Sequence, residues 1–389
     1  MSAPAFEEYR AIDTDTHITE PADLWTSRVA SKWGEAIPHI ERIEGRDVWL
    51  IEGQPCGAPG PTTMAGFDGS YPEGPMGYDD IPKSAYDSAA RIEHMDAEGI
   101  QVQVLYPNVG GFGSGGFLRL KEPELMLECV RAYNDFLVEW ASVAPERLVA
   151  VAAMPFWDRD QAVAEVQRAA SIGHKAVLAC SEPQAFGQPR LADAHWDPFW
   201  AAAQEAGVSI SFHIGAGDLS DLVNDSMKIG TRANFGRISS LVFMQNANCF
   251  ADLIFGGVCH RFPNLDMVSV ESGVGWIPTY LEMADWQWVN GQIRKEHPEY
   301  DLLPSEYFRR QIYGCFWLER EGMHGAVEQY VDNILWETDF PHPTCQHPGL
   351  VDGLAQHPRD YVEAAMGHLN EETRRKILHD NAAKLYGLD

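Results

Sequence analysis

Short runs of apolar residues recur along the chain and alternate with longer segments whose apolar residues return every three or four positions. Short aliphatic or β-branched runs followed by Gly, Pro or Asp predict buried parallel strands, and the longer periodicity predicts amphipathic helices. The runs that fit the strand pattern are Arg10–Asp15, Val102–Tyr106, Leu148–Met154, Ala176–Ala179, Ser209–His213, Met267–Glu271, Arg310–Cys315 and Asn333–Glu337. This alternation is typical of repeated βα units.

The segments between these runs end at residues that favour helix boundaries. Asp158–Ser171, for example, begins at a residue that can cap a helix and ends before Gly173. The predicted helices are Ser88–Ala97, Glu122–Ser142, Asp158–Ser171, Asp197–Ala206, Pro278–Val289, Glu319–Tyr330 and Glu371–Tyr386. Eight strands separated by helices predict an α/β fold of the closed (β/α)8 TIM-barrel type, because no GxGxxG motif follows the first strand as in an open nucleotide-binding sheet.

One long stretch lacks this alternation. Residues 33–86 are rich in Gly and Pro, with one possible hairpin around Asp47–Glu52. A loop of this length within a compact domain is usually functional, and its position after the first strand places it over the C-terminal mouth of the barrel. We therefore expect residues 1–389 to form one barrel domain with 33–86 as an inserted lid or subunit contact. The glycine-rich segment 110–116 leads into no helical pattern, which favours a flexible loop over a nucleotide-binding one.

Residue types that bind metals stand at the ends of three predicted strands. The first strand reaches Asp15 and His17, two positions apart, so both side chains can face the barrel interior. His213 ends the fifth strand, and Asp339 follows the eighth. Barrel enzymes place their chemistry at these strand ends, and two imidazoles with two carboxylates suit a divalent ion that keeps an open position. We predict these four residues as metal ligands, with ordinary polar strand ends and turns as the alternative.

Five segments spread over nearly the whole chain form one recognisable set. They are DTDTHITEPADLW at 13–25, ARIEHMDAEGIQVQVLYP at 90–107, the strand that ends at His213, RFPNLDMVSVESGVGWIP at 261–278 and NILWETDFPHP at 333–343. In this order they resemble the amidohydrolase superfamily, in particular the branch of aminocarboxymuconate-semialdehyde decarboxylase-like and resorcylate decarboxylase-like enzymes. The resemblance implies that Asp339 is a metal ligand, because the Asp of the corresponding family element binds the metal.

Three positions depart from the pattern of these enzymes. Their first motif often reads HxH or ExH, whereas Asp15-x-His17 makes the predicted site harder and more anionic. Their sixth strand often ends in a proton-transferring His, whereas Glu271 stands here and can serve as acid or base only if burial raises its pKa. Binuclear relatives carry a carbamylated Lys at the end of the fourth strand, but Lys175 stands at the beginning of that strand. A mononuclear site is therefore favoured.

Further candidate residues surround the predicted ligands. Asp339, Glu271 and His342 form the predicted catalytic set. Glu271 has two alternative roles, as a further metal ligand or as a buried carboxylate paired with an arginine, and His342 could instead order its surroundings or fill a turn. The predicted substrate contacts near the barrel mouth are Glu20, Tyr106 and Trp276.

The composition of the chain indicates which binding partners and which cellular compartment to expect for this protein. The chain carries 29 Lys and Arg against 57 Asp and Glu, a formal net charge of −28, which argues against nucleic acids and anionic membranes as partners. No run approaches the roughly 18 apolar residues of a membrane span, and the N-terminus lacks the pattern of a signal peptide. The seven scattered cysteines contain no CxxC pair, which fits a reducing compartment. We therefore expect a cytoplasmic protein with a small-molecule substrate.

The sequence as a whole predicts a metal-dependent lyase or hydrolase that acts on a small, carboxylated or cyclic organic substrate, by decarboxylation or hydrolysis at a mononuclear site. One divalent ion is the expected cofactor, with Zn²⁺ preferred and Mn²⁺ or Fe²⁺ as alternatives. Competing hypotheses are a hydratase on the same site, an inactive barrel that acts as a binding protein, and a Rossmann-type oxidoreductase. By resemblance to enzymes that are often dimers, we expect a homodimer.

Overall fold

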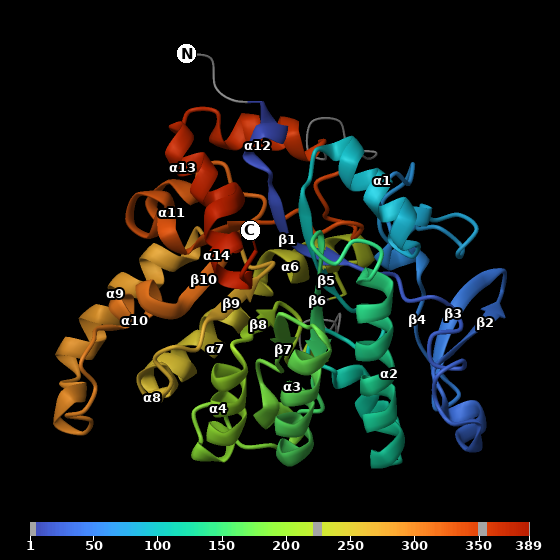
Figure 1. The fold of residues 1–389 in the computed structure, drawn as a ribbon, viewed down its shortest axis with the longest axis horizontal. Coiled ribbons are helices and arrows are strands. Elements are labelled where there is room, and N and C mark those ends of the chain that lie inside the picture. The colour runs from blue at the N-terminus through green and yellow to red at the C-terminus, as the bar shows by residue number, and fades with distance from the viewer. Residues whose placement is uncertain (1–4, 221–227, 349–355, 389) are drawn as a thin grey trace.

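Eight parallel strands form a closed barrel in the computed structural model of the protein, which describes residues 5–220, 228–348 and 356–388 (Figure 1). Their order around the barrel is β1-β11-β10-β9-β8-β7-β6-β5. The strands are β1 (Ile12–His17), β5 (Val102–Tyr106), β6 (Leu148–Ala153), β7 (Ala176–Leu178), β8 (Ser209–His213), β9 (Met267–Val270), β10 (Ile312–Phe316) and β11 (Ile334–Trp336). The predicted (β/α)8 barrel is confirmed.

All eight predicted strands are present, and no boundary is shifted by more than two residues. Two shifts have a clear physical reason. The strand predicted from Arg310 begins at Ile312, because α10 (Pro304–Gln311) runs directly into β10. Glu271 lies just outside β9, because its φ of 53° is left-handed and incompatible with a strand. This second shift turns the Glu271 side chain into the mouth of the barrel.

The helices pack around this barrel. They are α1 (Ser88–Glu98), α2 (Pro123–Ala141), α3 (Arg159–Ile172), α4 (Asp197–Ala206), α6 (Thr231–Leu241), α7 (Phe243–Phe255), α8 (Val258–Arg261), α9 (Trp276–Asn290), α10, α11 (Met323–Tyr330), α12 (Pro358–Met366), α13 (Glu371–Arg375) and α14 (Asn381–Tyr386). The four helices predicted before residue 207 are confirmed to within one residue at each end. In α3, the Asp158 carboxylate caps the first turn and Gly173 ends the helix with a left-handed φ of 116°.

The second half of the chain differs from the prediction at several helices. The helix predicted from Glu319 begins at Met323, because the Glu319 carboxylate instead accepts hydrogen bonds from backbone N–H groups that follow β9 and β10. The helix predicted over 371–386 contains a π-helical turn at Lys376–Asp380 that separates α13 from α14. The prediction also missed α6, α7, α8, α10 and α12.

Apolar side chains fill the interior of the barrel. One buried cluster includes Ile12, Val104, Val151, Leu178, Val270 and Leu335 from the strands, together with Ala382 and Tyr386 from α14. The interior is therefore packed, and α14 closes the end of the barrel where the strands begin. Polar groups that could act on a substrate therefore lie at the other end of the barrel, where the strands finish.

The insertion after β1 has two parts. The first is a three-stranded antiparallel sheet of β2 (His39–Ile43), β3 (Arg46–Ile51) and β4 (Gln54–Gly57), which lies beside α2 at the right of Figure 1. The Trp33 indole donates to Glu128 of α2 at 3.0 Å, and Glu52 pairs with Lys121 at 3.1 Å. The hairpin predicted around Asp47–Glu52 belongs to this sheet.

The second part, residues 60–78, reaches the strand ends. The backbone N–H groups of Met64 and Ala65 donate to the Pro341 carbonyl, which lies in the loop after β11. Tyr71 stacks on Phe235 of α6 with ring centroids 4.3 Å apart, and α6 follows β8 on another side of the mouth. This part therefore extends between two sides of the mouth. Whether it acts as a lid or a subunit contact stays a prediction.

α6 and α7 together form a long apolar helical stretch. Within Thr231–Phe255, a window of 18 residues has a mean hydropathy of 1.2, so the stretch is long and apolar enough, by length and composition alone, to cross a membrane. The stretch is divided at Val242, however, and Phe250 of α7 packs against Phe212 of β8 with ring centroids 5.6 Å apart. Such packing is that of a helix on the outside of the barrel.

Candidate metal centre

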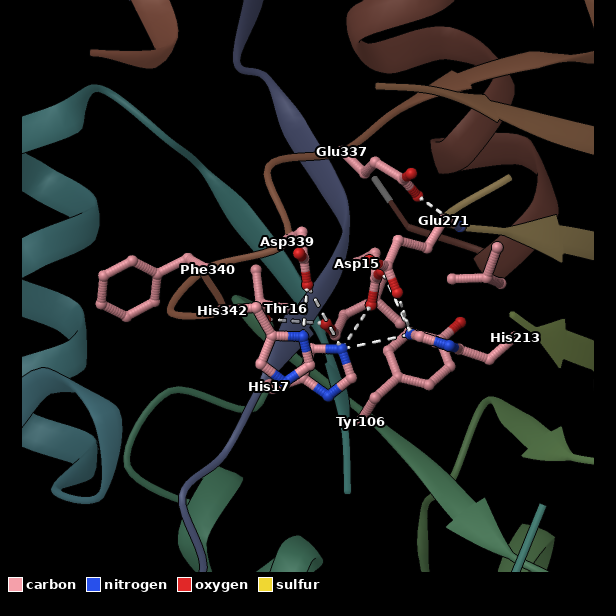
Figure 2. A network of polar contacts seen from close by, with 12 residues as sticks. Asp15, Thr16, His17, Tyr106, His213, Glu271, Glu337, Asp339, Phe340 and His342 are labelled. Carbon is pink, nitrogen blue, oxygen red and sulfur yellow. Dashed lines mark hydrogen bonds and ion pairs between the residues drawn. The ribbon is translucent and has the colours of Figure 1, made fainter. Parts of the chain in front are cut away.

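Side chains from four strand ends converge at the mouth of the barrel (Figure 2). The His17 Nε2 lies 3.5 Å from Asp15 Oδ1 and 3.6 Å from Asp339 Oδ1. The His213 Nε2 lies 3.4 Å from both Asp15 Oδ2 and Glu271 Oε2. Potential ligand atoms of Asp15, His17, His213 and Glu271 all lie within 4.8 Å of one another. The structure thus brings together the four predicted ligands and adds Glu271 to them.

Backbone carbonyls fix the orientation of both imidazoles. The His17 Nδ1 lies 3.0 Å from the Pro107 carbonyl oxygen, and the His213 Nδ1 lies 2.7 Å from the Ile214 carbonyl oxygen. A carbonyl only accepts, so each Nδ1 carries the proton in these contacts. In the neutral rings, each Nε2 then presents a lone pair, and the two Nε2 atoms are 3.2 Å apart. Two lone pairs directed at one point fit a shared cation.

The carboxylates around this point also lack partners. Both oxygens of Asp15 and the Oδ1 of Asp339 are buried without a hydrogen bond. Buried carboxylate oxygens without partners are costly, because they have lost their hydration and gained nothing in return. A divalent cation would satisfy these oxygens together with both imidazole lone pairs. The residues therefore fit a single divalent metal ion.

The carboxyl groups strongly perturb one another. Burial raises the pKa of Glu271 well above its usual value, and the charge of Asp339 and a hydrogen bond to it raise it further. Burial and the charge of Asp15 likewise raise the pKa of Asp339. Glu337, buried beside them, has a raised pKa for the same reasons and accepts a hydrogen bond from the Glu271 N–H at 3.1 Å. Several of these groups cannot ionise together unless a cation compensates them.

The pKa values of His17 and His213 are shifted in opposite directions. Burial lowers the pKa of His17 well below its usual value, and the neighbouring imidazoles of His342 and His213 lower it further. Burial would also lower the pKa of His213, but the carboxylates of Asp15 and Glu271 outweigh it and raise the value. A metal ion would take the place of the proton that these carboxylates attract to His213.

His342 contacts three residues at the site: His17, Asn108 and Asp339. Its ring stacks on that of His17 with centroids 3.7 Å apart. The Asn108 side-chain amide donates to the Ile18 carbonyl, so its Oδ1 faces His342 and accepts from Nε2–H at 2.7 Å. Burial lowers the pKa of His342 to about 3, which leaves Nδ1 unprotonated, 2.7 Å from Asp339 Oδ1. Two lone-pair atoms this close repel unless a proton or a cation lies near both.

An open pocket reaches the cluster from one side. It has about 700 Å³ of space, including the part open to solvent, and lies between α6, the residues after β9 and those after β10. Its lining includes Glu271 together with Trp276, Trp317 and Phe243. Glu271 is 6% exposed, whereas Asp15, His17, His213 and Asp339 are completely buried. Glu271 is therefore the member of the cluster that a substrate in this pocket would meet.

The comparisons with known proteins show which family the chain belongs to. The amidohydrolase family model matches residues 12–388, nearly the whole chain. The chain belongs to the amidohydrolase family. The predicted resemblance is confirmed, and with it the prediction of an enzyme of this superfamily, of the hydrolase or decarboxylase kind. The Rossmann-type alternative is wrong, because the strands close into a barrel.

Two relatives of this amidohydrolase are decarboxylases by name. The 2-amino-3-carboxymuconate-6-semialdehyde decarboxylase of Dictyostelium discoideum is 21% identical over 376 residues, which cover 94% of this chain and 91% of that protein. The gamma-resorcylate decarboxylase of Rhizobium sp. (strain MTP-10005) is 26% identical over 312 residues, which cover 77% of this chain and 86% of that protein.

Solved structures share the fold of this amidohydrolase. An amidohydrolase from Mycobacterium avium subsp. paratuberculosis K-10 is 26% identical with a TM-score of 0.75, over 97% of this chain and 99% of that one. A dihydroxybenzoic acid decarboxylase from Polaromonas sp. JS666, solved with bound manganese and the inhibitor 2-nitroresorcinol, has a TM-score of 0.62 at 18% identity, over 97% of both chains.

The three predicted substrate contacts lie in different surroundings. Trp276, the first residue of α9, lines the pocket beside Glu271. Tyr106 is fully buried beneath the cluster, where its hydroxyl lies 2.9 Å from Ser211 Oγ. Glu20 is also fully buried, and its carboxylate accepts hydrogen bonds from the N–H groups of Asn108 and Val109. The Tyr106 ring lies beside both imidazoles, with centroids 6.0 Å from that of His17 and 5.5 Å from that of His213. For Tyr106 and Glu20, contact with the substrate stays a prediction.

Sequence reasoning missed several residues of this amidohydrolase's site. Phe112, in the glycine-rich segment 110–116, lies over both imidazoles, with its ring centroid 4.2 Å from that of His213 and 5.0 Å from that of His17. Arg91 of α1 is fully buried and donates to the His17 carbonyl at 2.7 Å. The ARIEHMD segment contains Arg91, so the family resemblance could have pointed to it, whereas no local pattern marks Phe112.

Proposed function

We propose that this amidohydrolase is a metal-dependent decarboxylase of a small cyclic or aromatic carboxylic acid. The observation that carries the proposal is the position of Glu271, which lies in the pocket wall and also 3.4 Å from the His213 Nε2. Trp276 and Trp317 place flat apolar surfaces in the same pocket, which suits a ring. The named decarboxylases among the relatives support the same chemistry.

In this proposal Asp15, His17, His213 and Asp339 hold one divalent ion, with Zn²⁺, Mn²⁺ and Fe²⁺ as the candidates. The ligand set combines imidazole nitrogens with carboxylate oxygens, which all three ions accept. When bound, such an ion would draw electron density toward the carboxylate or a neighbouring oxygen of the substrate.

Glu271 acts as the proton donor. Its place at the inner wall of the pocket lets its carboxyl reach a substrate carbon, and burial, which raises the pKa of Glu271, favours the protonated form there. The bond between the ring carbon and the carboxylate breaks, CO₂ leaves, and the electron pair stays on the ring carbon. That carbon takes the proton of Glu271 to form the new C–H bond. Glu271 then regains a proton from water in the open pocket.

The surrounding side chains hold this arrangement in place. Asn108 fixes the His342 ring through Nε2–H, and His342 in turn supports the His17 ring by stacking. Arg91 holds the backbone of His17, so the imidazole direction does not depend on its side-chain contacts alone. Phe112 covers both imidazoles and excludes water from that side.

Hydrolysis at the same site is the second candidate. It is favoured by the pair of His342 Nδ1 and Asp339 Oδ1, which lie 2.7 Å apart and could accept a proton from an attacking water. In this alternative Glu271 would give its proton to the leaving group, and the substrate would be a cyclic ester or amide.

Product analysis in H₂O and D₂O separates the two candidates. The metal-loaded enzyme would be incubated with a panel of hydroxylated benzoates and other cyclic carboxylic acids, with lactones and amides alongside. We expect CO₂ release from a carboxylic acid and one solvent deuterium on the carbon that carried the carboxylate. Turnover of lactones or amides without any CO₂ release from the acids would instead support the hydrolase.

Three finer predictions accompany the proposal. The insertion 33–86 acts as a lid or a subunit contact, and the contacts of its residues 60–78 with both the β11 loop and α6 support a position over the mouth of the barrel. The homodimer and the cytoplasmic location rest on the sequence alone. Sedimentation analysis of the purified protein and localisation of the tagged chain would test these last two.

A further inference from the structure

A second histidine–carboxylate cluster lies outside the barrel mouth, between α1 and the segment after β11. His94 and Glu98 are four residues apart on α1, so they share one face of the helix. His347 approaches them from the loop that follows β11. One potential ligand atom from each of these three residues lies within 4.8 Å of the other two.

The state of these side chains suits coordination. Burial lowers the pKa of His94 to about 3 and also lowers that of His347, so both imidazoles are neutral near pH 7 and keep a free lone pair. The Nδ1 of His347 is buried without a hydrogen-bond partner. The Glu98 side chain is 7% exposed and supplies the negative charge.

A fourth residue orients the carboxylate. The Nδ1 of His357, at the start of α12, lies 3.0 Å from each oxygen of Glu98. Because a carboxylate only accepts, His357 donates in this contact. A histidine that donates to a ligating carboxylate is a common partner around metal ions, since it fixes the direction of the oxygen lone pairs.

We propose that His94, Glu98 and His347 bind a divalent transition-metal ion, with His357 as the residue that positions Glu98. Two imidazoles and one carboxylate with a fourth position for water match the ligand chemistry of Zn²⁺. This site is separate from the strand-end cluster and shares no ligand with it.

The site would tie α1 to the loop that carries Asp339 and His342. Phe340, next to Asp339, stacks on the His94 ring with centroids 4.2 Å apart. The same loop accepts hydrogen bonds from Met64 and Ala65 of the insertion at the Pro341 carbonyl. A metal ion bound to His94 and His347 would therefore tie the loop at His347 to the same helix that Phe340 contacts through the His94 ring.

The test is the Zn²⁺ content of the purified full chain after equilibrium dialysis against micromolar free Zn²⁺. We expect the wild type to hold about one equivalent more than the His94→Ala/His347→Ala variant. The His17→Ala/His213→Ala variant should keep this equivalent, and Zn²⁺ should raise its melting temperature by a few degrees. Equal Zn²⁺ content in the wild type and in His94→Ala/His347→Ala would overturn the proposal.

Two variants keep the result interpretable. His347→Gln removes one ligand from a half-buried loop position, so it should fold even if the double variant does not, and it should also lose the additional equivalent. His39→Ala is the matched control, because His39 likewise lies beside two carboxylates, those of Glu35 and Glu41, but is remote in sequence. Loss of the equivalent in His39→Ala, with retention in His347→Gln, would place the ion elsewhere and contradict the proposal.

Discussion

The two histidine–carboxylate clusters of this protein are built on different kinds of structure. In the strand-end cluster, the ligand side chains of β1 and β8 are completely buried and each imidazole is fixed by a backbone carbonyl. In the α1 cluster, two ligands share a helix face, but the third comes from a loop, and the supporting His357 side chain is 48% exposed. The barrel therefore provides a site whose geometry exists before binding, whereas the outer site depends on the position of a loop. We expect tight binding and catalysis at the first, and weaker, stabilising binding at the second.

Substitution of a strand-end ligand should have the largest effect. Asp339→Asn or His213→Ala removes one of the four ligands of the proposed ion, so kcat/KM should fall by at least about 10³-fold. Steady-state kinetics with circular dichroism of each variant measures the loss and checks the fold. His260→Ala should keep full activity as the control, because His260 of α8 contacts Tyr300 and Tyr307 and belongs to neither cluster. Full activity in Asp339→Asn would disprove the site.

Glu271→Gln separates proton donation from metal binding. The amide keeps the size of the side chain but cannot donate a proton to carbon, so kcat should fall by about 10²- to 10⁴-fold. Metal content should stay at the wild-type level, because the other ligands remain. A variant that loses its metal would show that Glu271 is mainly a ligand, and one with normal kcat would remove it from catalysis.

Asn108→Ala tests whether the residues around the strand-end cluster affect metal binding or catalysis. The change releases the His342 ring, whose stacking holds His17, so metal affinity or kcat should fall by about 10- to 100-fold. Competition with a metal chelator measures the affinity. An unchanged affinity and an unchanged kcat together would show that the imidazoles hold their positions without this contact.

Glu20→Gln should change stability in a pH-dependent way. Burial raises the pKa of Glu20 from 4.5 to about 7. Its contribution to stability is therefore fully present below about pH 4.5 and is lost as the pH rises through about 7. Glutamine does not ionise, so the free energy of unfolding of the variant should exceed that of the wild type by about 3 kcal/mol above pH 7 and match it near pH 4.5. Urea unfolding at both pH values measures the difference in stability between the variant and the wild type. If the ionisation of Glu20 did not affect stability, this difference would be the same at both pH values.

His357→Ala should have the smallest effect. Because His357 supports Glu98 and is half exposed, its loss should weaken Zn²⁺ binding at the outer site by about 10-fold. Activity should remain unchanged, since the strand-end ligands are untouched. Titration of Zn²⁺ into the His17→Ala/His213→Ala background isolates this affinity, and an equal affinity with and without His357 would exclude its positioning role.

The barrel and its metal ligands could be predicted because their signals are local. Each strand is a short apolar run with a turn after it, and the alternation of side chains places Asp15 and His17 on one face. The order of these segments along the chain then indicated the resemblance to the amidohydrolase superfamily. The prediction of Glu271 as a participant also came from its position at a strand end, although its left-handed backbone appears only in the structure.

The supporting residues could not be predicted, because their roles arise from contacts between distant segments. Phe112 belongs to a glycine-rich segment with no periodicity, and only the folded loop places its ring over His213. Asn108 and Glu337 act through partners far along the chain, so no spacing marks them. The outer cluster combines a visible pair on α1 with His347, more than 240 residues later, and the sequence alone does not join them.

The most direct test of the central claim is elemental analysis of the wild type beside the His17→Ala/His213→Ala variant, after exhaustive dialysis against metal-free buffer. Dialysis should strip the weaker outer site and leave the tight one filled. We predict about one equivalent of Zn, Mn or Fe per chain in the wild type, with loss of both metal and activity in the folded variant. An unchanged metal content in the variant, or full activity of a metal-free wild type, would contradict the account.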